Sequence, residues 1–242
     1  IRPPMVNRGL PIGRGVALRR VRLGPRLYIH LIALVPVTAG STFPARTILA
    51  YDLQRLNSPG NASSGTGLWL RDLMDIRQIC LDPYPTPTVV LQDLRRAEMV
   101  GLYGSCRKLH GHGNDAMSAA VRRVERSALN VRERPTVLLL GGDQSYADDV
   151  SDLLIQEIAR LGEELQGAPE PMPDIQGRVS AVGIGGRQAI VSNRAWFTSG
   201  EARNHLITFG EFAATYLLAW NPDIWPASLP NSDAVYRDQD PS

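Results

Sequence analysis

Two short polar segments, Gly104–Arg107 and Gly142–Tyr146, carry the residue types whose spacing suggests chemistry. Their sequences are GSCR and GDQSY, and each follows an apolar run. Small residues let the chain turn sharply after such a run, so side chains from two neighbouring loops can converge. Carboxylates bind hard cations, and an iron(III) centre also accepts phenolate and thiolate donors. Asp143, Tyr146 and Cys106 supply all three donor types, so the two segments predict a metal site.

Each of these residues also has an ordinary structural interpretation. Asp143 suits a turn, and Asp148 and Asp149 suit the capping of a following helix. We favour capping for Asp148 and Asp149 and the ligand role for Asp143. Most free cysteines are small buried hydrophobic residues, which is the alternative for Cys106. Ordinary packing is the alternative for Tyr146, and residue types alone leave these alternatives open.

The pattern of apolar runs, from which the positions of strands and helices are predicted, changes near residue 95. Before it, short apolar runs lie between Gly-, Ser- and Pro-rich separators such as SPGNASSGTG, and no helical period is visible. Such a pattern predicts a small β domain over residues 1–95. The strands that we expect are Leu27–Val37, Thr47–Leu56, Gly67–Leu73 and Thr88–Leu94.

Residues 96–242 alternate between strand and helix patterns, which predicts a βαβ unit with a parallel sheet. Strands are expected at Met99–Cys106 and Thr136–Leu140, and ligands gather at the carboxyl ends of parallel strands. Both polar segments lie there. The first helix is expected after Asn114 or Asp115, with Met117, Val121, Val124 and Ala128 on its apolar face.

Two further helices are predicted in the same region. The second should bury Val150, Leu154, Ile158, Leu161 and Leu165, and GAPEPMPDIQG (residues 167–177) should follow as a loop. The third should run from about His205 to Trp220. Its expected apolar face consists of Phe209, Phe212, Ala213, Tyr216, Leu217 and Trp220.

The composition suits a protein that buries a core: 43% of its 242 residues are hydrophobic and 21% are charged. The net charge is only +2, so we expect no overall field that recruits nucleic acid or membrane, and we identify no nucleic-acid-binding patch.

Leu27–Val37 is far shorter than the roughly 20 residues of a membrane helix. Cys80 and Cys106 form no disulfide framework and fit a reducing compartment such as the cytoplasm.

The charge is unevenly distributed. Residues 1–51 contain Arg2, Arg8, Arg14, Arg19, Arg20, Arg22, Arg26 and Arg46 and no acidic residue. Such a bias can mark a transit peptide or a basic arm. Strand-like alternation and several prolines favour a structural interpretation over a targeting helix.

The quoted motifs resemble a known family. The sequences YGSCRK and GGDQSYADD are similar to those of the alkaline phosphatase D (PhoD-like) branch of the metallophosphoesterases, in which a strand ends in S-C-[RQ] and a GDxxY motif follows. The sequence NHLITFGEFAATYLLAW (204–220) resembles a helix of the larger bacterial members. Residues 1–95 are similar to the immunoglobulin-like N-terminal domain of the family. The resemblance is tight over residues 103–150 and 204–220 and loose elsewhere.

The resemblance implies a role for each candidate residue. Asp143 would be a metal ligand that bridges two ions, and Tyr146 and Cys106 would bind iron. Calcium or another divalent ion would occupy the second position. Arg107 would contact the phosphate ester, because guanidinium matches phosphate geometry; a surface salt bridge is the equal alternative for Arg107. Ser145 replaces the usual isoleucine of the motif, which we expect to affect packing and not chemistry.

The sequence also departs from the family. No downstream Asn-His-[Asp/Glu] motif is present, and the only histidines are His30, His110, His112 and His205. The HGHG segment (110–113) is explained equally well as a glycine-rich turn, and a ligand role for His205 is not favoured. GIGGRQ (183–188) lacks the strand-to-helix context of a nucleotide-binding fingerprint.

We therefore expect an incomplete metallophosphoesterase: a small β domain followed by the first half of an α/β catalytic domain. The intact enzyme would hydrolyse phosphate mono- or diesters with metal-activated water. The chain alone would bind metal weakly, show little activity, and self-associate through an exposed sheet edge. The main alternative is a non-catalytic metal-binding or assembly module of the same fold. Exported family members leave the compartment open, and a nucleotide-binding α/β domain is a third, weaker alternative.

Overall fold

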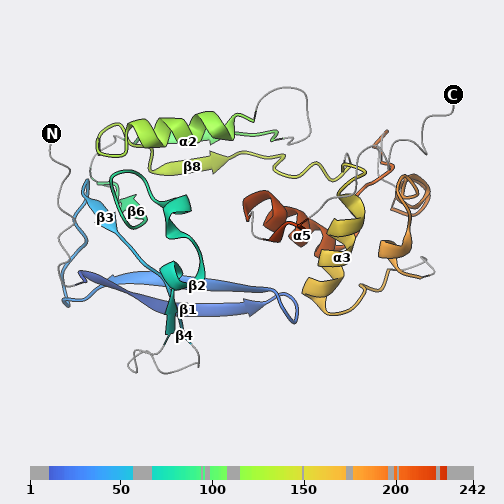
Figure 1. Cartoon of the computed structure of the whole chain (residues 1–242), viewed down its shortest axis with the longest axis horizontal. Coiled ribbons are helices and arrows are strands. Elements are labelled where there is room, and N and C mark those ends of the chain that lie inside the picture. The colour runs from blue at the N-terminus through green and yellow to red at the C-terminus, as the bar shows by residue number, and fades with distance from the viewer. Residues whose placement is uncertain are drawn as a thin grey trace. The chain divides into compact units, whose positions relative to one another are not determined.

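The chain is a mixed α/β protein with small two-stranded sheets (Figure 1). The computed structural model describes residues 11–56, 67–93, 95, 99–107, 115–148, 150–172, 177–195, 199–200, 202–221 and 224–227. Over these residues no sheet closes into a barrel. The mixed α/β class expected from the sequence is confirmed.

The chain forms two compact units, each built from several segments. The first contains residues 1–16, 34–104 and 114–141, and the second contains residues 17–33, 105–113 and 142–242. The division into domains at residues 1–95 and 96–242 stays a prediction.

Two small antiparallel sheets belong to the first unit. Strand β3 (Ile48–Ala50) pairs with β6 (Thr88–Val90), and β4 (Gln54–Leu56) pairs with β5 (Gly67–Trp69). The strand expected at Thr47–Leu56 is thus two strands, and the one expected at Thr88–Leu94 ends at Val90.

The strand expected at Gly67–Leu73 is also wrong beyond Trp69, where helix α1 (Leu70–Leu73) begins. The carboxylate of Asp72 accepts a hydrogen bond from the amide of Trp69 at 2.8 Å, which starts the helix. A short 3-10 helix, η1 (Ile76–Ile79), follows.

The βαβ unit is confirmed in the first unit. Strand β7 (Gly101–Gly104), helix α2 (Met117–Arg126) and strand β8 (Val137–Leu140) follow in order, and β7 pairs parallel to β8. The carboxylate of Asp115 accepts from the amide of Met117 at 3.0 Å, so Asp115 caps the helix, while Asn114 lies outside the described residues. Ala128 of the expected apolar face is buried, but Val121 is exposed.

The second unit has a helical core. Helix α3 (Ile155–Gln166) packs against helix α5 (Phe209–Trp220), and 3-10 helix η2 (Val179–Ala181), helix α4 (Gln188–Ile190) and π-helix η3 (Val191–Ala195) lie between them in the sequence. Strands β1 (Gly13–Arg22) and β2 (Tyr28–Pro36), which each have residues in both units, pair with each other, and this confirms the strand expected near Leu27–Val37. The buried core consists of Val150, Ile155, Ile158, Leu165, Leu206, Ala214 and Leu218.

Two helix predictions need correction. Helix α3 begins at Ile155, so Asp148 lies too far upstream to cap it, and Asp149 lies outside the described residues. Helix α5 begins only at Phe209, because the Thr208 hydroxyl and the Glu211 carboxylate form a capping box. Its inner face is Gly210, Glu211, Ala214 and Leu218, whereas Phe209, Tyr216 and Trp220 of the expected apolar face are about half exposed.

The α3–α5 contact requires glycine on both helices. A Cβ atom at Gly162 would lie 2.7 Å from the carbonyl carbon of Gly210, and one at Gly210 would lie 2.6 Å from the carbonyl oxygen of Gly162. These distances are far below a van der Waals contact between carbon and backbone atoms, so the helices touch along their backbones.

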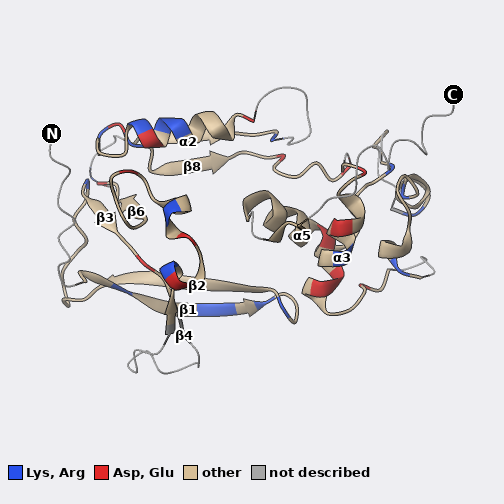
Figure 2. Ribbon diagram, viewed as in Figure 1, with Lys and Arg blue, Asp and Glu red and all other residues tan. Residues whose placement is uncertain are grey.

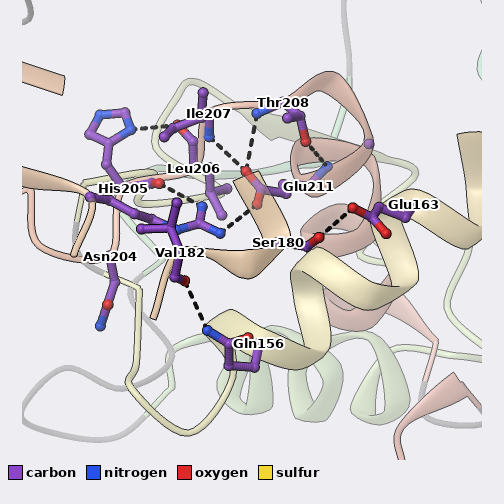
Figure 3. Close-up of polar contacts among 12 residues, drawn as sticks. Gln156, Glu163, Ser180, Val182, Asn204, His205, Leu206, Ile207, Thr208 and Glu211 are labelled. Atoms are coloured by element: carbon purple, nitrogen blue, oxygen red, sulfur yellow. Dashed lines mark hydrogen bonds and ion pairs between the residues drawn. The ribbon is translucent and has the colours of Figure 1, made fainter. Parts of the chain in front are cut away.

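A buried ion pair anchors the start of α5. Arg187 and Glu211 are 0% and 2% exposed, and Arg187 Nη2 donates to Glu211 Oε1 at 2.7 Å. Arg187 Nη1 donates to the carbonyl of His205 at 2.9 Å. Glu211 Oε2 also accepts from the amides of Ile207 and Thr208, as Figure 3 shows. Several hydrogen bonds therefore compensate the two charges, although Arg187 Nε is buried without a hydrogen-bond partner among the described residues.

We predict that Gly162→Ala lowers the free energy of unfolding by about 1–3 kcal/mol, because the added methyl group must separate α3 from α5. Gly183→Ala is the matched control, since a Cβ at Gly183 meets nothing within 4 Å. Chemical denaturation monitored by circular dichroism measures both variants. Equal stabilities of the two variants would contradict the close approach of the helices.

For the ion pair, we predict that Arg187→Met lowers the free energy of unfolding by about 3–5 kcal/mol, because the Glu211 carboxylate is left buried without its cation. The double variant Arg187→Met/Glu211→Leu should recover much of that loss, since it removes both buried charges. Urea denaturation measures the free energy of unfolding of the parent and of both variants. A double variant that is less stable than Arg187→Met would argue against the pairing.

Candidate metal and phosphate site

Backbone hydrogen bonds continue past the ends of β7 and β8. The amide of Gly141 donates to the carbonyl of Gly104 at 2.8 Å. Next along the chain, the amide of Cys106 donates to the carbonyl of Gly142 at 3.1 Å, and that of Arg107 to the carbonyl of Asp143 at 2.9 Å. The loops that follow the two strands are therefore held side by side, as the parallel pairing predicts.

The side chains of Cys106 and Asp143 meet on these loops. The thiol of Cys106 donates to Asp143 Oδ2 at 3.1 Å, and both residues are exposed to solvent. Both belong to the second unit, together with Arg107 and Tyr146. The structure thus brings together two of the three ligands predicted from the sequence.

Tyr146 joins this pair through its phenol group. A side-chain hydrogen bond with Cys106 is the largest cause of a raised pKa of Tyr146. Desolvation and the nearby charges of Asp143 and Asp148 raise that pKa further, because each of them disfavours the phenolate. All three predicted ligands therefore form one cluster, in which the tyrosine is protonated near neutral pH.

The backbone of the cluster is strained. Cys106 has φ of 58° and Asp143 has φ of 51°, and Arg46 is the only other non-glycine residue with positive φ in the described part of the chain. Aspartate tolerates this conformation better than most residues, whereas cysteine has no such preference. Strain of this kind persists where the surroundings enforce it, and it concentrates at functional sites.

Arg107 contacts the C-terminal end of helix α5. Its Nη1 atom lies 3.5 Å from the carbonyl oxygen of Ala219, at the limit of a hydrogen bond, and its guanidinium carbon lies 5.2 Å from the centre of the Trp220 ring. A cation is stabilised at this end of a helix by the helix dipole. Sequence reasoning missed this contact, because it assigned Trp220 to the buried face of the helix. The phosphate contact of Arg107 stays a prediction.

Neighbouring polar residues have structural roles. The hydroxyl of Ser199 donates to Asp148 Oδ2 at 3.2 Å, a contact that no feature of the sequence indicated. Gln144 Nε2 donates to the carbonyl of Gly142 at 2.6 Å, which braces the turn. The hydroxyl of Ser145 is buried and has no hydrogen-bond partner within the described part of the chain. It therefore occupies a packed position, where an apolar residue would satisfy the surroundings better.

The histidines add no ligand that the structure describes. His205 is mostly buried, and its Nδ1 atom lies 2.5 Å from the carbonyl oxygen of Leu206. His30 belongs to strand β2, where its ring lies 6.4 Å from that of Tyr28. His110 and His112 lie outside the described residues.

The donor set of the cluster fits a transition metal. Thiol and carboxylate atoms 3.1 Å apart match two ligands of one ion, since such ligands lie about 2.0–2.3 Å from the metal. Thiolate, phenolate and carboxylate together suit iron(III). Over the residues that the structure describes, no group of three or more His, Cys, Asp or Glu side chains is placed to hold a metal ion.

Comparison with known proteins assigns no family, because no protein-family model, curated protein or solved structure matches this chain. Over the described residues, no helix has the length and apolar character needed to cross a membrane.

We predict that Cys106→Ala lowers the pKa of Tyr146 toward the ordinary value of 10.0, because it removes the hydrogen bond that stabilises the neutral phenol. An NMR titration of ring-labelled tyrosine measures this pKa, with Tyr146→Phe to assign the signal. Cys80→Ala is the control, because the Cys80 thiol donates to the carbonyl of Ile76 in another part of the chain. An unchanged Tyr146 pKa in Cys106→Ala would show that the two side chains do not interact.

Proposed function

We propose that this chain carries the first part of a metal-dependent phosphoesterase site, which hydrolyses phosphate mono- or diesters. The observation that supports the proposal most directly is the convergence of Cys106, Asp143 and Tyr146 where two parallel strands end. Ligands bind at this position in open parallel sheets.

The proposal includes the family that the motifs resemble. The β7–α2–β8 unit would be part of a metallophosphoesterase sheet of the PhoD-like type, and the strands before residue 95 would form its immunoglobulin-like domain. Asp143 would bridge iron and a second divalent ion such as calcium. Tyr146 and Cys106 would complete the iron side.

When bound, such a metal pair lowers the pKa of a water molecule and neutralises charge on the phosphate. The protein residues would prepare the site for this chemistry. The phenol of Tyr146 and the thiol of Cys106 must release their protons before they bind a metal, so affinity should rise with pH. Arg107 would donate hydrogen bonds to two oxygens of the phosphate, while Trp220 and the end of α5 orient its side chain.

The second candidate function is a non-catalytic metal-binding or assembly module. The absence of a third His, Cys, Asp or Glu side chain beside Cys106 and Asp143, within the residues described, favours this alternative. A pair of metal ions needs more ligands than one carboxylate, one thiolate and one phenolate provide.

Elemental analysis of the purified chain tests the proposal, together with an assay on an aryl phosphodiester. We predict that the parent binds iron and that Asp143→Ala loses it, because the carboxylate supplies the shared ligand. Asp75→Ala is the matched control, since it removes an exposed carboxylate that pairs with Arg77 elsewhere in the chain.

The outcomes bear on the two candidate functions differently. Metal lost only in Asp143→Ala, with hydrolysis by the parent, supports the phosphoesterase. The same metal pattern without hydrolysis fits either an incomplete phosphoesterase site or the binding module. No metal in the parent, or equal metal in all three proteins, overturns the assignment of the site.

A further inference from the structure

The β1–β2 pair is a ribbon whose base rests on the helical core. The amide of Leu23 donates to the carbonyl of Leu27 at 2.9 Å across the turn, and the amide of Val37 donates to the carbonyl of Ile12 at 3.0 Å at the other end. The amide of Arg26 donates to the carbonyl of Leu165 in α3 at 3.3 Å, and Leu27 packs against the core. The turn end of the ribbon is therefore fixed to the second unit.

Arginines gather at this end of the ribbon. Arg19, Arg20, Arg22 and Arg26 are all exposed and all belong to the second unit. Figure 2 shows arginine positions (blue) along β1 and no Asp or Glu (red) on β1 or β2. In the part of the chain that the structure describes, none of these four arginines pairs with a carboxylate, and the first acidic residue of the sequence is Asp52.

Aromatic rings share one face with two of these arginines. The guanidinium of Arg20 lies 4.3 Å from the centre of the Tyr28 ring, and the rings of Tyr28 and His30 are 6.4 Å apart. Side chains two apart on a strand point to the same face, so Arg22 follows Arg20, and His30 follows Tyr28. The hydroxyl of Tyr28 donates to the carbonyl of Pro25 at 3.3 Å, which orients its ring. We call Arg20, Arg22, Tyr28 and His30 the ribbon face.

We propose that the ribbon face binds single-stranded nucleic acid. Guanidinium groups match phosphate oxygens in pairs, and they also stack on planar rings. Proteins that bind single strands combine positive charge along the backbone with aromatic rings on which bases stack. The ribbon face presents both features within a few residues. An anionic membrane surface would also attract the positive charge, but that attraction does not require aromatic rings beside the guanidinium groups.

The proposal is compatible with the small net charge of the chain. The net charge is only +2, because 24 acidic residues lie after residue 51 and offset 26 basic ones. A long-range field is therefore weak, while the field near the ribbon is positive. Binding should accordingly be local, moderate in affinity and strongly dependent on salt.

Fluorescence anisotropy with a labelled oligothymidylate tests the proposal on the full chain. We predict binding at low salt that weakens about tenfold or more in Arg20→Ser/Arg22→Ser. The slope of log affinity against log salt should also fall by about 1.4, since each lost phosphate contact on a single strand contributes about 0.7. Arg122→Ser/Arg123→Ser is the matched control, because it removes equal charge from exposed positions on α2.

The aromatic part of the ribbon face has its own test. Tyr28→Leu should weaken oligothymidylate binding about tenfold without changing the salt slope, and Tyr28→Phe should restore the parent affinity, because only the ring is needed for stacking. Equal losses in the two arginine double variants would overturn the proposal, since charge alone would then explain binding. So would binding to phosphatidylserine vesicles with none to the oligothymidylate.

Discussion

The candidate site depends on the hydrogen bonds that extend the β7–β8 ladder into the two following loops. These bonds hold Cys106 and Asp143 in a left-handed backbone conformation, which aspartate tolerates better than cysteine does. Each such residue costs on the order of 1–3 kcal/mol, and each hydrogen bond returns only about 0.5–1.5 kcal/mol. The rest must come from the packing of the chain on either side of the loops.

On one side, that packing comes from the helical core of the second unit. The chain enters the core directly after Tyr146: the carbonyl of Ala147 accepts from the amide of Leu206 at 2.7 Å, and Val150 is buried. On the other loop, Arg107 contacts the end of α5, the helix that the Arg187–Glu211 pair and the Gly162–Gly210 contact hold in place. A strained, exposed cluster is thus connected to the buried helical core of the unit. We interpret this arrangement as preorganisation of the three donors.

The features that the sequence predicted well are those that local chemistry determines. The runs before Gly104 and Gly142 are short and apolar and end in small residues, so their strands and the following loops could be placed from the sequence. The parallel pairing followed from the helix between them. Convergence of Cys106 with Asp143 then required only that parallel strands end at the same edge.

The features that the sequence did not predict depend on tertiary contacts. Helix α5 is apolar around most of its circumference, so periodicity could not show that Gly210 and Glu211 face inward. That orientation results from Gly162, which lies 48 residues before its contact Gly210, and from Arg187, which lies 24 residues before its partner Glu211. The helix at Leu70 depends instead on a local hydrogen bond, from the amide of Trp69 to the carboxylate of Asp72, that residue types alone do not specify.

If Cys106, Asp143 and Tyr146 bind one metal ion together, titration of the chain with iron(III) should produce a visible absorption band, because a phenolate bound to iron(III) gives a charge-transfer transition. We predict that this band grows to one equivalent of iron, is absent in Tyr146→Phe and shifts in Cys106→Ser. The same spectrum for the parent and Tyr146→Phe would show that the tyrosine is not a ligand.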